Sequence, residues 1–180
     1  LEKAFEGRKL KTCISIANEK TFLPDIQTDE HIWIDAKAQR AGQYSEIDWN
    51  TITPLDEELI ENMRHTEAVF FTMIERYEVQ ESTPYAERKR QYFDHLRFWN
   101  HMLETKRIDI LLMYHVPHQC YDYVLYNLCK LKGIPTLMIE RTCSFDTFFI
   151  IEDWEESSKE LEKRLHELQE EYNDPKKEIP

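Results

Sequence analysis

The chain has little glycine and none of the glycine-rich patterns that bind nucleotides. Only Gly7, Gly42 and Gly133 occur among its 180 residues. GxGxxG and GxxxxGKS/T are absent, so a dinucleotide fingerprint and a P-loop are unsupported. GxSxG and HExxH are absent too, which removes the sequence signatures of α/β-hydrolases and zinc proteases. Each glycine is therefore expected at a turn or a helix end.

Long apolar runs and paired cysteines are also missing. No stretch approaches the ~20 apolar residues of a membrane helix, and the first residues show no secretory signal pattern. Cys13, Cys120, Cys129 and Cys143 form no CxxC pair. We interpret them as reduced thiols in or near the core, which is typical of a reducing compartment. The sequence therefore predicts a cytoplasmic protein without a membrane span.

Basic side chains are fewer than acidic ones, 23 against 35, so the formal net charge is −12. Residues 152–180 contain 11 acidic and 5 basic side chains, so half of the excess, −6, lies in this last segment. An acidic surface repels phosphate backbones, so nucleic acids and anionic membranes are not expected as partners. Binding of a small phosphorylated ligand is still compatible with this charge, because one arginine and a helix N-terminus can bind it.

Alternating strand and helix patterns predict an α/β fold. Two proline-led starts, Thr53-Pro54 and Thr83-Pro84, begin helices with apolar residues at helical spacing. The loop expected at 38–50 surrounds Gly42. Strands are expected at 11–17, 31–36, 108–114, 134–140 and, as an edge or extended segment, 145–151; helices are expected at 54–78, at 84–106, from near Pro117 to Gly133, and after a cap at 153–156.

The strongest prediction is a strand–helix–strand unit over 108–140. Its two strands, 108–114 and 134–140, are nearly continuously apolar, which favours parallel strands buried on both faces. The crossover between them should be right-handed. We predict a Rossmann-like three-layer domain with a mainly parallel sheet, two long helices before this unit, and a peripheral C-terminal helix. Residues 1–153 would form the domain, and 154–180 an acidic helix and tail.

The last helix has one narrow apolar stripe amid charged residues, formed by Leu161, Leu165, Leu168 and Tyr172. We interpret the stripe as a single seam that docks on the domain. The alternative is a surface for a protein partner or for a homo-oligomer.

Polar side chains follow both strands of the central unit. His115 and His118 come after the first, and Glu140, Arg141 and Thr142 end or follow the second. In open α/β sheets, ligands bind beyond the carboxyl ends of the strands. These residues are therefore the candidate site, with the histidines as the catalytic pair.

The chemistry expected there follows from the side-chain types. An imidazole exchanges protons near neutral pH, Asp122 could orient it, and the Arg141 guanidinium matches a phosphate or carboxylate. Several alternatives stay open. In the first, the histidines serve only as a cap and a turn; in the second, His115, His118 and Glu140 bind a metal; in the third, Cys120 is a nucleophile.

This region resembles a known family. The residues that carry the likeness are Ile108-Asp109-Ile110, Pro117-His118-Gln119, Asp122-Tyr123-Val124-Leu125-Tyr126, Gly133-Ile134-Pro135-Thr136 and Glu140-Arg141-Thr142. Over residues 108–153 the chain resembles bacterial capsule-type surface-polysaccharide biosynthesis proteins, which look like two-Rossmann-domain glycosyltransferases. The resemblance implies an N-terminal, acceptor-side half that needs a second, C-terminal domain. It implies a nucleotide sugar as co-substrate and a place for His118 at the interdomain cleft, as a base or phosphate contact.

Three functions follow as hypotheses. The first is a glycosyltransferase-like domain, incomplete on its own, that binds a glycan or other small-molecule substrate without a resident cofactor or metal. The second is a non-catalytic α/β module for a sugar phosphate or a protein partner. The third is a metal-dependent hydrolase that uses His115 and His118.

Overall fold

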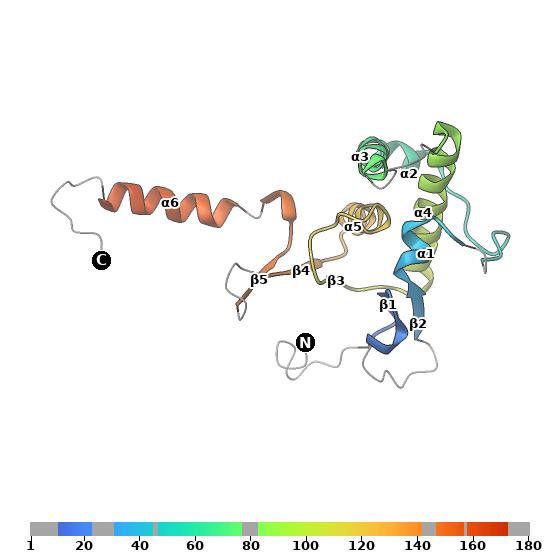
Figure 1. The fold of residues 1–180 in the computed structure, drawn as a ribbon, viewed down its shortest axis with the longest axis horizontal. Helices are drawn as coiled ribbons and strands as arrows, with labels where there is room; N and C mark the ends of the chain where they lie inside the picture. Colours follow the sequence, from blue (N-terminus) through green and yellow to red (C-terminus); the bar gives the residue numbers. More distant parts are fainter. Residues whose placement is uncertain are drawn as a thin grey trace. The chain divides into compact units, whose positions relative to one another are not determined.

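The computed structural model describes residues 11–22, 31–44, 47–76, 83–141, 147–156 and 158–172. The described elements are short strands and helices (Figure 1). In chain order they are β1 (Ile14–Ala17), η2 (Lys20–Phe22), β2 (Ile32–Asp35), α1 (Ala36–Arg40), α2 (Glu57–Asn62), α3 (Arg64–Glu75), α4 (Tyr85–Thr105), β3 (Leu111–Met113), α5 (Tyr121–Leu131), β4 (Thr136–Arg141), β5 (Phe148–Ile151), η3 (Trp154–Glu156) and α6 (Lys159–Tyr172). Among these residues, no helix combines the length and the apolar character needed to cross a bilayer.

The chain divides into two compact units. Unit 1 comprises Leu1–Asp109 and Pro117–Ile134, and unit 2 comprises Ile110–Val116 and Pro135–Pro180. Unit 1 therefore contains β1, β2 and the helices α1 to α5, whereas unit 2 contains β3, β4, β5 and α6.

Parallel pairing of the two central strands is confirmed. β3 pairs with β4 in parallel, with Leu111 opposite Thr136 and Met113 opposite Met138. β5 joins the other side of β4 in antiparallel direction, which makes it the expected edge strand. β1 and β2 are parallel and form a separate two-stranded sheet. The described strands thus form two small sheets, where the sequence predicts one mainly parallel sheet.

The helix predicted over 54–78 is divided into α2 and α3. The division falls at Met63, which has φ −97° and ψ 8° and only 2% exposure. The Met63 carbonyl accepts hydrogen bonds from the amide of Glu67 and from the hydroxyl of Tyr92, at 3.0 and 2.8 Å. Periodicity cannot reveal such a break, because the apolar spacing continues across it. The additional hydrogen bond to Met63 comes from the hydroxyl of Tyr92 in α4.

The predicted start of this helix is also wrong by three residues. Asp56 is the N-cap of α2, and its carboxylate accepts the amide of Leu59 at 2.7 Å. The Thr53 hydroxyl instead lies 3.0 Å from Nδ1 of His101 in α4. Asp35 caps α1 in the same way, so residues predicted as part of a loop are helical. In both places an aspartate carboxylate accepts a backbone amide at the start of the helix, and aspartate is among the most favourable N-cap residues.

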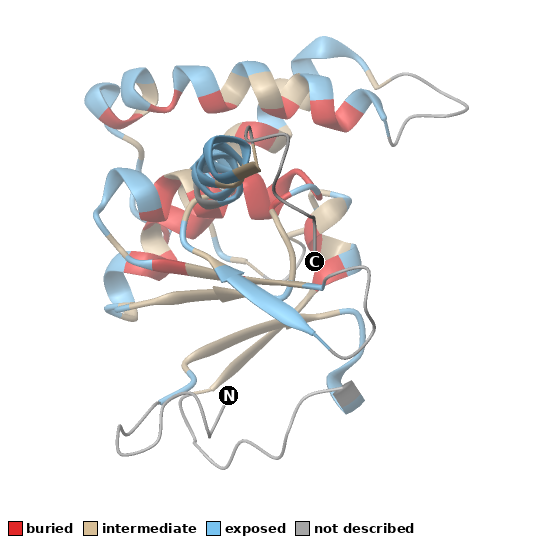
Figure 2. Ribbon diagram, turned by 90° about the vertical axis from the view of Figure 1, so that its left-hand side faces the viewer, coloured by how far each residue is buried: buried red, intermediate tan, exposed pale blue. Residues whose placement is uncertain are grey.

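The core of unit 1 lies between its helices. α4 packs against both α5 and α3, and its apolar face is buried as predicted, except that Tyr85 is 64% exposed. Figure 2 shows in red that most buried positions lie on helices. The fully buried side chains of this face of α4 are Tyr92, Leu96 and Trp99. Burying large aromatic and aliphatic side chains is the main stabilising contribution here.

Alanine substitutions at Gly42 and Gly133 separate the stability cost of backbone strain from the cost of displacing a packed side chain. Both have positive φ, +63° and +67°. A Cβ on Gly42 would lie 2.5 Å from Cγ of Gln91, whereas a Cβ on Gly133 would meet nothing within 4 Å. We expect Gly133→Ala to cost about 1 kcal/mol through backbone strain alone. Gly42→Ala should cost about 1–2 kcal/mol more, because it also displaces a packed side chain.

Urea unfolding of the two variants measures this difference. The Gln91 amide also donates to the Arg40 carbonyl at 3.1 Å, so the side chain cannot move away without losing that bond. Equal losses in the two variants would contradict the close contact at Gly42.

Candidate functional site

The carboxyl edge of β3 and β4 in unit 2 carries three of the predicted site residues: His115, Glu140 and Arg141. The Glu140 carboxylate accepts the backbone amide of Val116 at 2.6 Å. This bond ties the end of β4 to the segment that follows β3. It follows from the parallel pairing, since both strands end at the same edge.

His115 lies half-buried in the segment that Glu140 holds. Its Nδ1 hydrogen-bonds the carbonyl of Val116 at 2.7 Å, and because a carbonyl only accepts, Nδ1 carries the proton. The imidazole also contacts the Tyr114 ring edge-on, with centroids 4.0 Å apart. Nε2 is then the atom that can accept or return a substrate proton.

Arg141 is exposed at the end of β4, where it pairs in register with Phe148 of the edge strand. A guanidinium at a strand end has the planar donor geometry that phosphate and carboxylate oxygens require. Glu140, by contrast, already bonds a backbone amide, so its role in unit 2 is to position the loop. Thr142 lies outside the described residues.

His118 and Asp122 belong to unit 1. Asp122 is 4% exposed, and its two carboxylate oxygens accept the amides of His118 and Gln119, at 3.0 and 2.7 Å. Its observed contacts therefore fold the loop before α5. Asp122 is also a favourable charge in the first turn of that helix. The imidazole of His118 is exposed.

The prediction that a helix begins near Pro117 is wrong, because α5 begins at Tyr121. Cys120 has φ 66° and ψ −72°, and the amide of Tyr121 bonds the carbonyl of Gln119 at 2.8 Å. This is a γ-turn with positive φ, a rare and strained conformation. Proline at a helix start is a common pattern, and nothing in the local sequence indicates this turn.

The structure places the six predicted residues in three groups. His115, Glu140 and Arg141 lie in unit 2, His118 and Asp122 lie in unit 1, and Thr142 is not described. Within unit 2 the candidate site comprises one imidazole and one guanidinium, with Glu140 as a support.

Cys120 is unsuited to the nucleophilic role that the sequence leaves open. It is 1% exposed, and burial raises the pKa of its thiol to about 12. Burial likewise raises the pKa of Cys129 to about 12. Both thiols are protonated at neutral pH, whereas nucleophilic attack needs the thiolate. Their reading as buried, reduced core residues is confirmed.

A buried polar network in unit 1 has no counterpart in the sequence prediction. His95 of α4 is fully buried, and its Nδ1 lies 2.5 Å from the hydroxyl of Tyr44. That hydroxyl is also 3.1 Å from the Gln39 carboxamide oxygen. Nε2 of His95 has no hydrogen-bond partner, and burial lowers the pKa of His95 to about 3. The histidine is thus a neutral core residue, and its place on the buried side of α4 is the signal that could have found it.

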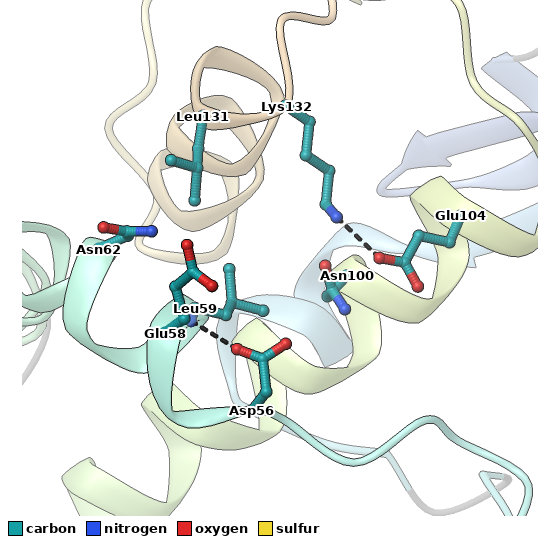
Figure 3. Close-up of a pocket in the computed structure, with 8 residues that line it drawn as sticks. All are labelled: Asp56, Glu58, Leu59, Asn62, Asn100, Glu104, Leu131 and Lys132. Atoms are coloured by element: carbon teal, nitrogen blue, oxygen red, sulfur yellow. Dashed lines mark hydrogen bonds and ion pairs between the residues drawn. The ribbon is translucent and has the colours of Figure 1, made fainter.

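A pocket of about 180 Å³ lies between α2, α4 and the end of α5 in unit 1 (Figure 3). Asn100 lies in its wall with 5% exposure, and its Oδ1 has no hydrogen-bond partner. Lys132 crosses to Glu104 at 2.8 Å. The lining residues are Asp56, Glu58, Leu59, Asn62, Asn100, Glu104, Leu131 and Lys132.

This pocket does not suit the anionic ligand that the resemblance implies. It holds three carboxylates and one ammonium group, and the ammonium is already paired with Glu104. The remaining negative charge repels a nucleotide sugar. The edge of β3 and β4 therefore stays the better candidate for such a ligand.

Comparison with known proteins finds no match: no family model, no curated protein and no solved structure is significantly similar to this chain.

Proposed function

We propose that this chain is the acceptor-side domain of a glycosyltransferase-like protein of surface-polysaccharide synthesis, with a Rossmann-like arrangement. It binds the phosphate or carboxylate of a sugar compound at the carboxyl edge of β3 and β4. Arg141 contacts the anion, and His115 accepts or returns a proton at the sugar hydroxyl.

The observation that carries this proposal is the bond between Glu140 and the amide of Val116, at 2.6 Å, at the end of two parallel strands. It holds the segment with His115 next to the strand end that presents Arg141. Binding beyond the carboxyl ends of parallel strands is the general rule for open α/β sheets. The residue types also match, since an imidazole transfers protons and a guanidinium binds anionic oxygens.

The proposal predicts that Arg141→Ala weakens binding of the anionic sugar ligand by about 10- to 100-fold, the contribution of one charge-assisted hydrogen-bond pair. Calorimetric titration of the 180-residue chain with a panel of uridine, guanosine and cytidine nucleotide sugars, and with acceptor glycans, measures the loss. Binding should also weaken at higher salt, because the contact is between charges.

Arg64→Ala is the matched control. It removes the same charge from a side chain that is 73% exposed and paired with Glu61 on the helices α2 and α3. Its affinity should stay within about twofold of the parent chain. Equal losses in both variants would mean that only overall charge matters, and an absence of binding across the whole panel would remove the proposal.

The second candidate is a non-catalytic module that binds a sugar phosphate without converting it. The role of Glu140 favours it, since a carboxylate that already bonds a backbone amide is poorly placed for proton transfer. Both candidates predict binding that depends on Arg141. They differ in turnover: only the first predicts that the complete protein transfers sugar from a bound donor to an acceptor, at a rate that falls in His115→Ala.

A further inference from the structure

The helix α6 carries an apolar stripe with two exposed leucines and two half-buried residues. Leu161 and Leu165 are 73% and 54% exposed, and Leu168 and Tyr172 complete the stripe. The spacing of four, three and four residues is the alternation of a two-heptad coiled-coil seam. Because a helix turns by about 100° per residue, the four side chains lie within one narrow arc.

Charged side chains flank this stripe unequally. Arg164 and Glu171 lie on one side of it, and Glu162 and Gln169 lie on the other. Arg164 is 62% exposed and bonds Glu167 of its own helix at 3.0 Å. A guanidinium has five N–H donors, so Arg164 can keep this bond and still reach a second carboxylate.

We propose that α6 binds α6 of a second copy of this chain as an antiparallel pair. In an antiparallel seam, each flank of one helix meets the same flank of its partner. Arg164 then faces Glu171 of the second copy, and Glu171 faces the second Arg164, so one symmetric contact forms two ion pairs. Such a self-complementary patch is what a two-fold dimer requires.

The apolar contacts and the side-chain directions agree with this antiparallel alignment. Leu165 packs on Leu168 of the other copy, and Leu161 packs on Tyr172. Side chains on a helix lean toward its N-terminus, so Arg164 and the opposing Glu171 lean toward each other. On the other flank, the amide of Gln169 faces the carboxylate of Glu162, which avoids a second set of like charges. A parallel pair would instead place Arg164 opposite Gln169 and form no ion pair between them.

The test is a charge exchange in the 180-residue chain, followed by sedimentation velocity over a range of concentrations. Arg164→Glu places carboxylates opposite each other at both ion-pair positions, and Glu171→Arg places guanidinium groups there. We expect each single variant to raise the dimer dissociation constant by at least about tenfold, since two pairs change from attraction to repulsion. The double variant should return within about threefold of the parent chain, because its pairs are opposite charges again.

Mixing the two single variants gives the sharpest result. One chain then carries two acidic positions and the other two basic ones, so a heterodimer should form where each variant alone is monomeric. Lys163→Glu and Glu170→Arg are the matched controls, because they make the same charge changes on the face opposite the stripe. Circular dichroism confirms that α6 stays helical in all variants.

Three results would overturn the proposal. The parent chain could stay monomeric at the highest concentration, the single variants could dimerise as well as the parent, or the controls could dissociate as much as the variants. None of these outcomes depends on nucleotide-sugar binding, so this inference and the proposed function succeed or fail separately.

Discussion

Replacing Phe70 with alanine is expected to lower the free energy of unfolding by about 3–5 kcal/mol. Phe70 lies in α3 and is completely buried. Its ring contacts those of Tyr92 and His95, with centroids 5.4 and 5.7 Å away, so it joins α3 to the long helix α4. Removal of the ring leaves a cavity among aromatic side chains that are themselves fixed and cannot collapse into it.

The neighbouring residue is the matched control. Phe71 stacks on Tyr85 at 5.2 Å, but Tyr85 is 64% exposed and Phe71 is half-buried. Phe71→Ala should therefore cost only about 1 kcal/mol, because little of the lost contact is shielded from water. Urea titration of both variants, at equal m-values, gives the comparison. Similar losses from the two would contradict the packing of α3 described here.

The second large effect is a loss of stability in acid that comes from His95. Burial lowers the pKa of His95 in the folded protein from the ordinary value of 6.5 to about 3. Between these two values the unfolded chain binds one more proton at this residue than the folded chain does. The free energy of unfolding therefore falls as the pH falls, by up to ~1.4 kcal/mol for each pH unit below 6.5 and by about 4–5 kcal/mol in total. Above pH 6.5 this contribution does not change.

His95→Asn tests the assignment, because asparagine cannot titrate yet places a polar group near the hydroxyl of Tyr44. The variant is expected to be less stable at pH 7, where its smaller side chain leaves space, but to lose less stability between pH 6.5 and pH 4. Exposed His65 of α3 supplies the control. If His65→Asn flattened the pH profile as much as His95→Asn, the dependence would not come from the buried network.

The two regions that could bind a ligand differ in charge. The edge of β3 and β4 presents Arg141 and His115, whereas the pocket beside Asn100 is acidic. The phosphate ligand that we propose is expected at the first region and would be repelled by the second. The Arg141→Ala titration therefore locates the binding site as well as testing whether there is one.

Much of the described fold could be predicted from residue spacing. The apolar face of α4, the end of α5 near Gly133 and the edge position of β5 follow from periodicity, from the glycine and from the short apolar run. Each of these signals is local, because it depends on residues within a few turns or one strand. The break at Met63 and the cap at Asp56 were missed, since each depends on which of several competing hydrogen-bond partners wins.

The candidate site was predictable only in part. Parallel pairing of the two apolar strands put Glu140 and the segment after β3 at one edge, as the sequence predicts. The division of the site residues between two units could not be foreseen, and neither could the use of Asp122 and Glu140 as backbone partners. A carboxylate has the same sequence signature whether it binds a ligand or folds a loop.

The sequence by itself determined the apolar strands, the buried faces of the helices and the charge that disfavours nucleic acid, because these follow from the spacing and type of side chains along the chain. Only the tertiary structure decided which polar groups are already satisfied by the protein. It paired His95 with Tyr44, tied Glu140 to Val116 and left Leu161 and Leu165 of α6 exposed. The physical reason is that hydrogen bonds and burial join residues far apart in sequence, where periodicity carries no information.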